Sequence, residues 1–213
     1  MVNLRPFRDY DEKDVLNLFA LDTAVLDTAI TSWDTRVHAG SLVKHSTSGW
    51  HYDDEIFDIV SGQSAAGDLS VQNVTSDRWG VTAKVELCET GGDAVVGMML
   101  NHVALHDENG EQLKYNPRKA SELEAVLPWQ AVPIVRRGLF LVESTTMTAA
   151  TFNAGAVLTA AGGGANDGDF DLTAGSGETR VGYTLGNNNG TAGHADNHKY
   201  HLILLDIGGN AIQ

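Results

Sequence analysis

Cysteine is nearly absent from this chain of 213 residues. Its single occurrence, Cys88, excludes an intrachain disulfide framework and a metal cage built from thiolates. Cys88 stands in the segment "AKVELCE" beside Glu86 and Glu89, whose negative charges raise the pKa of a thiol and oppose its use as a nucleophile. We therefore predict that Cys88 is a small buried residue and not a catalytic one.

Basic residues are also few. The chain has 14 Lys and Arg against 28 Asp and Glu, a formal net charge of −14. Non-specific binding of nucleic acid depends on Lys and Arg that neutralise phosphates, so this class is excluded. No apolar run approaches the roughly 20 residues of a transmembrane helix, and the first segment, "MVNLRPFRDYDEKD", lacks the apolar region of a secretory signal. We expect no nucleic-acid partner, no membrane, and synthesis in the cytoplasm.

Proline is scarce, with four residues, whereas glycine occurs 23 times among many short β-branched runs. This composition is typical of strands separated by glycine turns and predicts a mainly β fold. A short helix is an alternative for the first of the predicted strands. The strands are expected at 15–21, 40–45, 55–60, 79–88, 95–105, 131–143, 155–160, 169–173, 180–185 and 200–207.

One helix is predicted, at about 117–126, within the segment "KYNPRKASELEAVLPW". Asn116 can cap its first turn, Pro117 suits the first helical position, and Pro128 is expected to end it. The preceding Asn109-Gly110 pair indicates a tight turn. The segment 101–130 is therefore predicted to be an insertion between two long strands.

Two short motifs recur in the same order along the chain. "HAGSLVK" at 38–44 is echoed by "NAGAVLT" at 153–159, and "VVGMML" at 95–100 by "RVGYTL" at 180–185. A long apolar strand, 131–142 or 200–207, follows each pair. This order predicts a small β-barrel or sandwich built from two similar halves, the first enlarged by insertions at 61–78 and 101–130.

These patterns predict the domain organisation. Residues 1–20 are expected to form an extended N-terminal arm and the first strand, with the arm lying against its own domain or against another chain. Residues 21–213 are expected to form a single barrel-like domain. Arg136 and Arg137 interrupt an apolar strand just before Gly138, where a bulge is expected.

The glycine-rich segment "AAGGGANDGDFDLT" has three possible interpretations. A phosphate loop is rejected, since no Lys-Ser/Thr pair and no helix pattern follow Gly164. Calcium remains an alternative, although Asn166–Asp169 lacks the spacing of an EF-hand. The favoured interpretation is a hairpin tip kept in water by Asp167 and Asp169.

The histidines also leave an alternative open. His194, Asp196, His198 and His201 lie within eight residues, which permits a zinc site, but a polar loop is the favoured interpretation because the segment lacks a fixed ligand frame. Three further histidines around the first hairpin are expected on the strand surface: His38, His45 and His51. No arrangement of residues typical of an active site is present, so we expect neither an enzyme nor a cofactor.

Several segments together resemble a known family. "AGSLVK", "AVPIVRRGLFLV" and "NAGAVLTAAGG…VGYTLG…YHLILLDI" are similar to the small β-barrel proteins that decorate, or cement, the heads of tailed bacteriophages. "NLRPFRDYDEKDVLNLFAL" and "DENGEQLKYNPRKASEL" are similar to phage virion structural proteins. The insertions at 61–78 and 101–130 depart from a minimal decoration barrel.

The resemblance implies a structural virion protein on the outer capsid surface. Its partners would be the major capsid protein and further copies of itself, as a dimer or trimer, and it would bridge neighbouring capsomers and stabilise the shell. The contacts are expected from residues 1–20 and from the apolar outer faces of 131–142 and 200–207. The candidate contact residues are Leu4, Arg5, Phe7, Arg8, Tyr10, Arg136 and Arg137.

A carbohydrate- or receptor-binding β module of a phage tail or fibre is the alternative. In that case exposed tryptophans would stack on sugar rings. The candidates, which are dispersed in the sequence, are Trp33, Trp50, Trp79 and Trp129.

Overall fold

The chain folds as a mainly β protein, as predicted, with one α-helix among the described residues. The structure is a computed structural model. It describes residues 2–23, 26, 29–46, 51–52, 81–128, 130–144, 154–161, 167–172, 177–188 and 200–208. The expected strand at 55–60, the insertion at 61–78 and the glycines at 162–164 lie outside these residues.

The elements follow one another along the chain, and most strands are short. The strands are β1 (Val2–Asp9), β2 (Val15–Leu16), β3 (Phe19–Leu21), β4 (Leu42–His45), β5 (His51–Tyr52), β6 (Val81–Leu87), β7 (Val95–Met99), β8 (His102–Val103), β9 (Ala125–Val126), β10 (Ile134–Val135), β11 (Arg137–Ser144), β12 (Val157–Ala160), β13 (Phe170–Asp171), β14 (Gly182–Asn188) and β15 (Tyr200–Asp206). The helical elements are α2 (Pro117–Glu122) and the 3-10 turns η1 (Glu12–Asp14), η3 (Trp33–Thr35) and η5 (Leu113–Tyr115).

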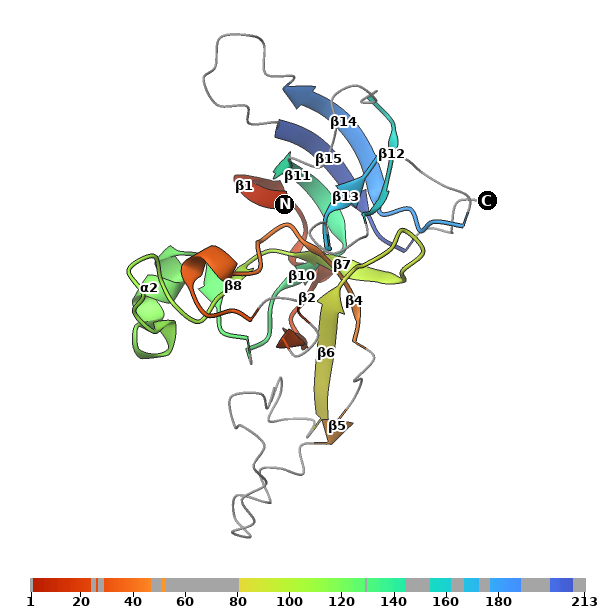
Figure 1. The fold of residues 1–213 in the computed structure, drawn as a ribbon. Helices are drawn as coiled ribbons and strands as arrows, with labels where there is room; N and C mark the ends of the chain where they lie inside the picture. The colour runs from red at the N-terminus through yellow and green to blue at the C-terminus, as the bar shows by residue number, and fades with distance from the viewer. Residues whose placement is uncertain are drawn as a thin grey trace.

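Two large sheets make up the body of the protein (Figure 1). The six-stranded sheet has the order β1-β11-β15-β14-β12-β13 and is curled like half of a barrel. The seven-stranded sheet has the order β2-β10-β7-β4-β6-β3, with β5 paired to β6. A small parallel pair, β8-β9, lies beside α2, to one side of the body.

The two sheets share one topology, which confirms the prediction of two similar halves. In the first half, five strands in chain order are β2, β4, β6, β7 and β10, and in the second half they are β11, β12, β13, β14 and β15. In both sheets the first of the five pairs with the fifth, the fifth with the fourth, the fourth with the second and the second with the third, always antiparallel.

The backbone hydrogen bonds of the two halves correspond atom for atom at the first motif. Gly40 and Gly155 both have positive φ angles, 99° and 85°. The amide of Gly40 donates to the carbonyl of Met99 at 2.8 Å, and the amide of Gly155 to that of Thr184 at 2.6 Å. The recurring "AG" is therefore a turn that only glycine adopts easily before the second strand of each half.

The second motif has an equally specific cause. At Gly97 a Cβ atom would lie 2.7 Å from the carbonyl oxygen of Val135, and at Gly182 one would lie 2.2 Å from that of Leu204. In both halves the fourth strand passes so close to the fifth that a side chain does not fit. The recurring "VG" marks this close approach.

Some predicted strands are divided in the structure. The segment 131–143 was expected to be one strand, but β10 belongs to the seven-stranded sheet and β11 to the six-stranded sheet, and the chain crosses between them at Arg136. The predicted strand 15–21 is likewise divided into β2 and β3, and 95–105 into β7 and β8. A pattern of apolar residues does not indicate where a strand changes its neighbours.

The main core lies between the two sheets and takes residues from both. Leu42 and Met98 of the first half pack with Phe140, Leu158 and Ile203 of the second. Cys88 belongs to this core, as predicted, and burial raises its pKa. Full burial of one such aliphatic or aromatic side chain stabilises the fold by about 1.5–3 kcal/mol.

A second cluster covers the opposite face of the seven-stranded sheet. Val43, Met99 and Ile134 of that sheet pack with residues from the segments that lead into and out of it. These covering residues include Phe19, Leu21, Ile30, Val37, Val103 and Val132. The sheet of the first half is therefore buried on both faces.

The insertion has its own small core and the predicted local signals. The Asn116 side chain accepts a hydrogen bond from the Lys119 amide at 3.2 Å, which caps α2. The buried Asp107 carboxylate accepts bonds from the amides of Asn109 and Glu111, which holds the predicted turn. The helix is shorter than predicted, because it ends at Glu122 and not at Pro128.

The predicted hairpin around the glycine-rich segment is confirmed by the antiparallel pair β12-β13. The prediction that Asp169 keeps its tip in water is wrong, since Asp169 is buried. Gly168 has a φ of +77° and its carbonyl accepts from the Leu42 amide at 2.7 Å, which joins this hairpin to the first half.

Candidate functional site

The N-terminal segment forms part of the six-stranded sheet. β1 pairs with β11 from Val2–Ser144 to Asp9–Leu139, and β2 then pairs with β10 in the other sheet. Between the two pairings, the Arg136 amide donates to the carbonyl of Asp14 at 2.9 Å. The two chain segments therefore cross from sheet to sheet side by side, as a two-stranded ribbon.

Three of the predicted contact residues are engaged within the chain. Leu4 is buried in the main core. Arg5 pairs with Glu143 and lies over the ring of Tyr200, with its guanidinium carbon 5.2 Å from the ring centre. Arg8 pairs with Glu124 of the insertion at 2.5 Å. These three residues hold the first strand to its own domain.

The other four predicted residues, of which Phe7 lies in β1 and the rest at the ribbon, are exposed. We call them the corner patch: Phe7, Tyr10, Arg136 and Arg137. Phe7 is 54% exposed and Tyr10 is 37% exposed while its ring stacks on Phe140, with 5.7 Å between the centroids. The Arg137 side chain is 62% exposed.

The close approach of the two segments at Gly138 explains where Tyr10 lies. Gly138 has a φ of +146°, and a Cβ atom there would lie 2.7 Å from the carbonyl oxygen of Asp9 and 2.8 Å from Cβ of Tyr10. Only glycine permits this approach, so Tyr10 lies against Gly138, the residue that follows the two arginines in the chain. The irregularity expected from the sequence at Gly138 is therefore present.

The outer edge of β1 is unsuited to pairing with a strand of another protein. The Leu4 amide already donates to the carbonyl of Ala39 at 3.0 Å. Pro6 has no amide hydrogen, and the pairing register shifts between Leu4 and Arg8. Proline and irregular register are common means of protecting a sheet edge. A partner would therefore meet side chains at this corner.

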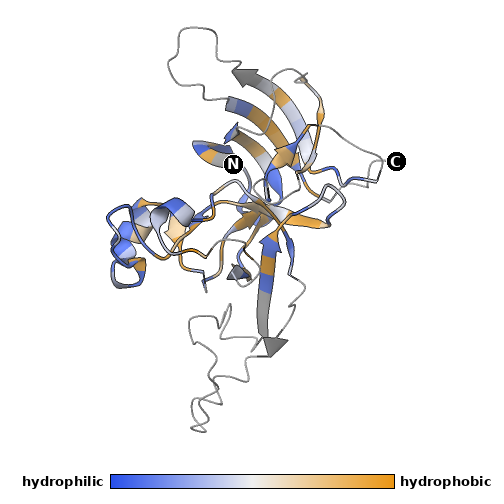
Figure 2. Ribbon diagram, viewed as in Figure 1, coloured by the Kyte–Doolittle hydropathy of each residue, from blue (hydrophilic) through white to orange (hydrophobic). Residues whose placement is uncertain are grey.

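The outer face of the six-stranded sheet is the second predicted contact surface. Leu139 lies opposite Leu204, and Leu141 opposite Leu202, and all four are half-buried. They belong to none of the three clusters of buried apolar residues in the described part of the chain. Apolar residues run along both β11 and β15 (Figure 2).

Salt bridges border this leucine patch at both ends. At one end, Arg137 and Arg180 both contact Asp206, at 3.0 and 3.6 Å. At the other end, Arg5 pairs with Glu143. Each end of the face therefore carries charges of both signs.

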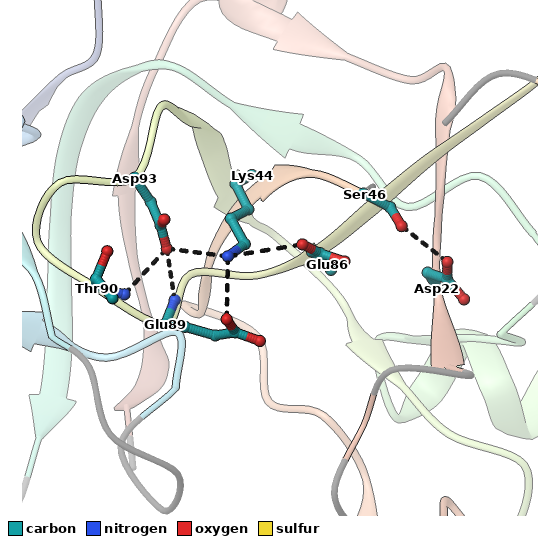
Figure 3. Close-up of polar contacts among 7 residues, drawn as sticks. All are labelled: Asp22, Lys44, Ser46, Glu86, Glu89, Thr90 and Asp93. Atoms are coloured by element: carbon teal, nitrogen blue, oxygen red, sulfur yellow. Dashed lines mark hydrogen bonds and ion pairs between the residues drawn. The ribbon is translucent and has the colours of Figure 1, made fainter. Parts of the chain in front are cut away.

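A polar cluster that no sequence pattern predicted surrounds Lys44 (Figure 3). Its ammonium contacts Asp93 at 3.2 Å, Glu89 at 3.3 Å and the buried Glu86 at 3.6 Å. Burial lowers the pKa of Lys44, but hydrogen bonds to Asp93 and Glu89 together outweigh it, so the pKa is raised. The lysine thus neutralises carboxylates that would otherwise repel each other beside the β4–β6 pair.

His38 is not on the strand surface, contrary to the prediction. It packs edge-to-face against His102 with 5.6 Å between the ring centres, and Nδ1 of His102 accepts a hydrogen bond from the Ala39 amide at 3.0 Å. Burial, followed by the charge of Arg36, lowers the pKa of both histidines to about 4. The pair joins the inserted β8 segment to the first half in the neutral form.

Trp33, the one described tryptophan, is also engaged within the chain. It packs against the core of the insertion, lies edge-on to His102 at 5.7 Å, and is covered by the guanidinium of Arg36 at 4.2 Å. Its ring is therefore in use as a packing surface. The other three tryptophans lie outside the described residues.

The described residues contain no group of three or more His, Cys, Asp and Glu placed to hold a metal ion. The histidine-rich segment 194–199 lies outside them. Within the same described part, no helix has the length and apolar composition to cross a membrane.

Comparisons with protein-family models, with curated proteins and with solved structures gave no match. The function is therefore inferred from the fold and its surfaces.

Proposed function

We propose that this chain is a decoration protein of a tailed-phage capsid. It binds the major capsid protein on the outer surface of the shell, bridges neighbouring capsomers and stabilises the particle. In this proposal the chain is not an enzyme and uses no cofactor. The observation that carries the proposal is the exposure of the corner patch, which contains four of the seven candidate contact residues, in β1 and at the ribbon.

The composition of the corner patch supports a protein-binding role. Phe7 and Tyr10 offer aromatic surface. Arg136 and Arg137 offer planar guanidinium groups, each of which can bind a carboxylate through two parallel hydrogen bonds. Aromatic residues and arginine are enriched among the residues that dominate binding energy at protein interfaces. The two aromatic residues favour a partner surface with apolar residues, and Arg136 favours one with carboxylates.

The architecture supports a mechanical role. The ribbon that presents the patch is hydrogen-bonded into both sheets, through β1-β11 and β2-β10. A load applied at the corner is therefore shared by the whole β body. The strongly acidic chain would also keep decorated particles apart in solution.

The proposal is tested with shells assembled from the major capsid protein of the phage that carries this gene. We expect the purified chain to sediment with them, and Phe7→Ala and Arg136→Ala each to weaken binding tenfold or more, which is about 1.4 kcal/mol. Tyr115→Ala is the matched control, since Tyr115 is an aromatic residue of the insertion that is 78% exposed and is not among the candidate contact residues. Equal binding by all four proteins, or none by the unchanged chain, refutes the proposal.

Removal of residues 1–14 is a poorer test than these substitutions. It would take away β1 and with it Leu4 from the main core. A loss of binding would then report the loss of the fold.

A further inference from the structure

The insertion 101–130 lies to one side of the body and is attached to it at a place that contains two histidines (Figure 1). We call this place the joint and define it by five residues: Arg8, Arg36, His38, His102 and Glu124. Beside the joint, the amides of Val37 and Val103 each donate to the carbonyl of the other, at 3.0 and 2.9 Å. The insertion has its own small core, and none of its described residues belongs to the main core between the sheets. The insertion can therefore separate at the joint while the main core stays closed.

The joint requires His102 in its neutral form. Nδ1 of His102 accepts a hydrogen bond from the Ala39 amide at 3.0 Å, so this nitrogen carries no proton. A proton on Nδ1 would place an N–H group against the N–H group of Ala39, and the buried amide would lose its acceptor. A single proton is therefore enough to break this contact between the insertion and the first half.

The surroundings of the two rings also oppose a positive charge. The rings of His38 and His102 pack edge to face with 5.6 Å between their centres, and Nδ1 of His38 is buried without a hydrogen-bond partner among the described residues. Charging one ring therefore disfavours charging the other, and a proton on Nδ1 of His38 would have no acceptor.

The charged groups that act on the two rings are mainly cations. Arg36 acts on both rings, Arg8 acts on His102, and the N-terminal amino group acts on His38, whereas Glu124 is the one carboxylate that favours a charged His102. The charge of Asp34 acts on Arg36. Burial, followed by Arg36, lowers the pKa of each histidine from 6.5 to about 4.

Glu124 gives the joint an unusual backbone. Its φ is +49°, a left-handed conformation that no other described residue except glycine adopts. It follows Leu123, the C-cap of α2, at a position where glycine is preferred. The Glu124 carboxylate pairs with Arg8 at 2.5 Å, and its carbonyl accepts from the His102 amide at 2.9 Å. Glycine would suit this backbone better but would leave Arg8 without its carboxylate, so the glutamate serves the joint.

We propose that the joint is an acid-sensitive latch, which opens when His102 and His38 take up protons, so that the insertion separates from the first half while the two large sheets stay folded. In the open form both rings are in water and titrate near 6.5, whereas in the closed form they titrate at about 4. The open form therefore binds more protons between these pH values. The stabilisation of the closed form is complete above pH 6.5 and is lost as the pH falls to 4.

Hydrogen exchange at single amides tests the latch. The amides of Val37, Ala39 and Val103 report on the joint, and those of Phe140 and Ile203 report on the buried centre of the six-stranded sheet. At pH 7 the protection factors of the joint amides should be roughly tenfold or more below those of the sheet amides, because opening the latch requires less free energy than unfolding the chain.

The protection of the joint should also depend on pH. Between pH 7 and pH 5, each histidine with these two pKa values raises the opening constant by a factor of about 20, before a discount for solvent screening. We therefore expect the protection factors of the joint amides to fall by at least about tenfold. The sheet amides should lose no more than the joint amides do, because complete unfolding exposes the same two histidines.

Two substitutions separate protonation from packing. In His102→Asn the side-chain oxygen can take the place of Nδ1 and accept from Ala39, but it takes up no proton at pH 5. His102→Asn combined with His38→Gln should reduce the pH dependence of the joint amides to less than about threefold, because neither new side chain titrates. His45→Asn is the matched control, since His45 is an exposed histidine of β4 outside the joint, and it should keep the full pH dependence.

His38→Gln alone provides a second measurement should the change at His102 impair folding, because Nδ1 of His38 has no described hydrogen bond to lose. It should reduce the pH dependence at least about threefold. Joint amides as well protected as the sheet amides, joint amides insensitive to pH, or a pH dependence that persists in the substituted chains overturns the proposal. No shell is present in these measurements, so this inference and the proposed function fail separately.

Discussion

Gly182 allows a direct measurement of how closely the strands of the second half are packed. A methyl group at this position would lie 2.2 Å from the carbonyl oxygen of Leu204 and 3.2 Å from Cα of Leu205. Since a carbon and a carbonyl oxygen in contact lie about 3.3 Å apart, β14 and β15 would have to separate by roughly 1 Å. No side-chain rotation can relieve the contact, because the obstructing atoms belong to the backbone.

We expect Gly182→Ala to lower the free energy of unfolding by about 3 kcal/mol, at the upper end of the cost of overpacking. For a chain of this length, about 1 kcal/mol changes the melting temperature by about 2–4 °C, so a decrease of roughly 10 °C is expected. Urea unfolding followed by tryptophan fluorescence measures the free energy, and a thermal scan measures the melting temperature.

Gly186→Ala is the matched control in the same strand. A Cβ atom at Gly186 would meet no other atom within 4 Å. Its unfolding free energy should stay within about 0.5 kcal/mol of the parent or rise slightly, because alanine loses less backbone entropy on folding. If Gly182→Ala costs no more than Gly186→Ala, the close approach of β14 and β15 is not the reason for the glycine.

Three further predictions follow from local contacts. Lys44→Met should cost about 2–3 kcal/mol at pH 7, because it leaves the buried Glu86 without its cation. The urea midpoint measures this loss. The folded pKa values of His38 and His102 lie below the unfolded value of 6.5. The unfolded chain therefore binds more protons, and the free energy of unfolding should fall as the pH is lowered from 6.5 to 4. After discounting for solvent screening the loss is about 1.5 kcal/mol for each, and a double Gln variant should show a flatter pH profile. Asn116→Ala should cost about 1 kcal/mol by removing the cap of α2, seen as a lower urea midpoint.

The recurring glycines explain why the two halves could be predicted from the sequence. Gly40 and Gly155 each adopt a positive φ, and Gly97 and Gly182 each face a neighbouring backbone. Such positions tolerate no other residue easily, so they persist as short motifs while the strands around them differ. The Asn116 cap was predictable for a similar reason, because it depends on contacts within a few residues.

The path of the N-terminal segment could not be predicted in the same way. The sequence around Leu4 indicates an extended segment, but its pairing with β11, more than 130 residues later in the chain, depends on the tertiary fold. The sequence gives no sign of the crossing at Arg136 either, because the strands on both sides of it are apolar. The contact of His38 with His102 also joins residues distant in the sequence.

The sequence indicated which segment carries the candidate contact residues, but not which of these residues pair within the chain and which are exposed. Charged and aromatic residues in an extended N-terminal segment suggest a surface contact, yet Arg5 and Arg8 pair within the chain. Only the register of β1 distinguishes them from Phe7 and Tyr10, which are exposed. A shift between Leu4 and Arg8 sets that register, and no local sequence pattern indicates this shift.

The difference between the halves lies in what surrounds equivalent strands. Residues such as Phe19 and Val103, from the segments between β2 and β4 and between β7 and β10, cover the outer face of the first half. At the other end of the molecule, the face equivalent to Leu42 and Met98 meets no described cluster. Under the proposed function, the exposed Phe7 in β1 and Arg136 at the ribbon between the sheets contact the major capsid protein.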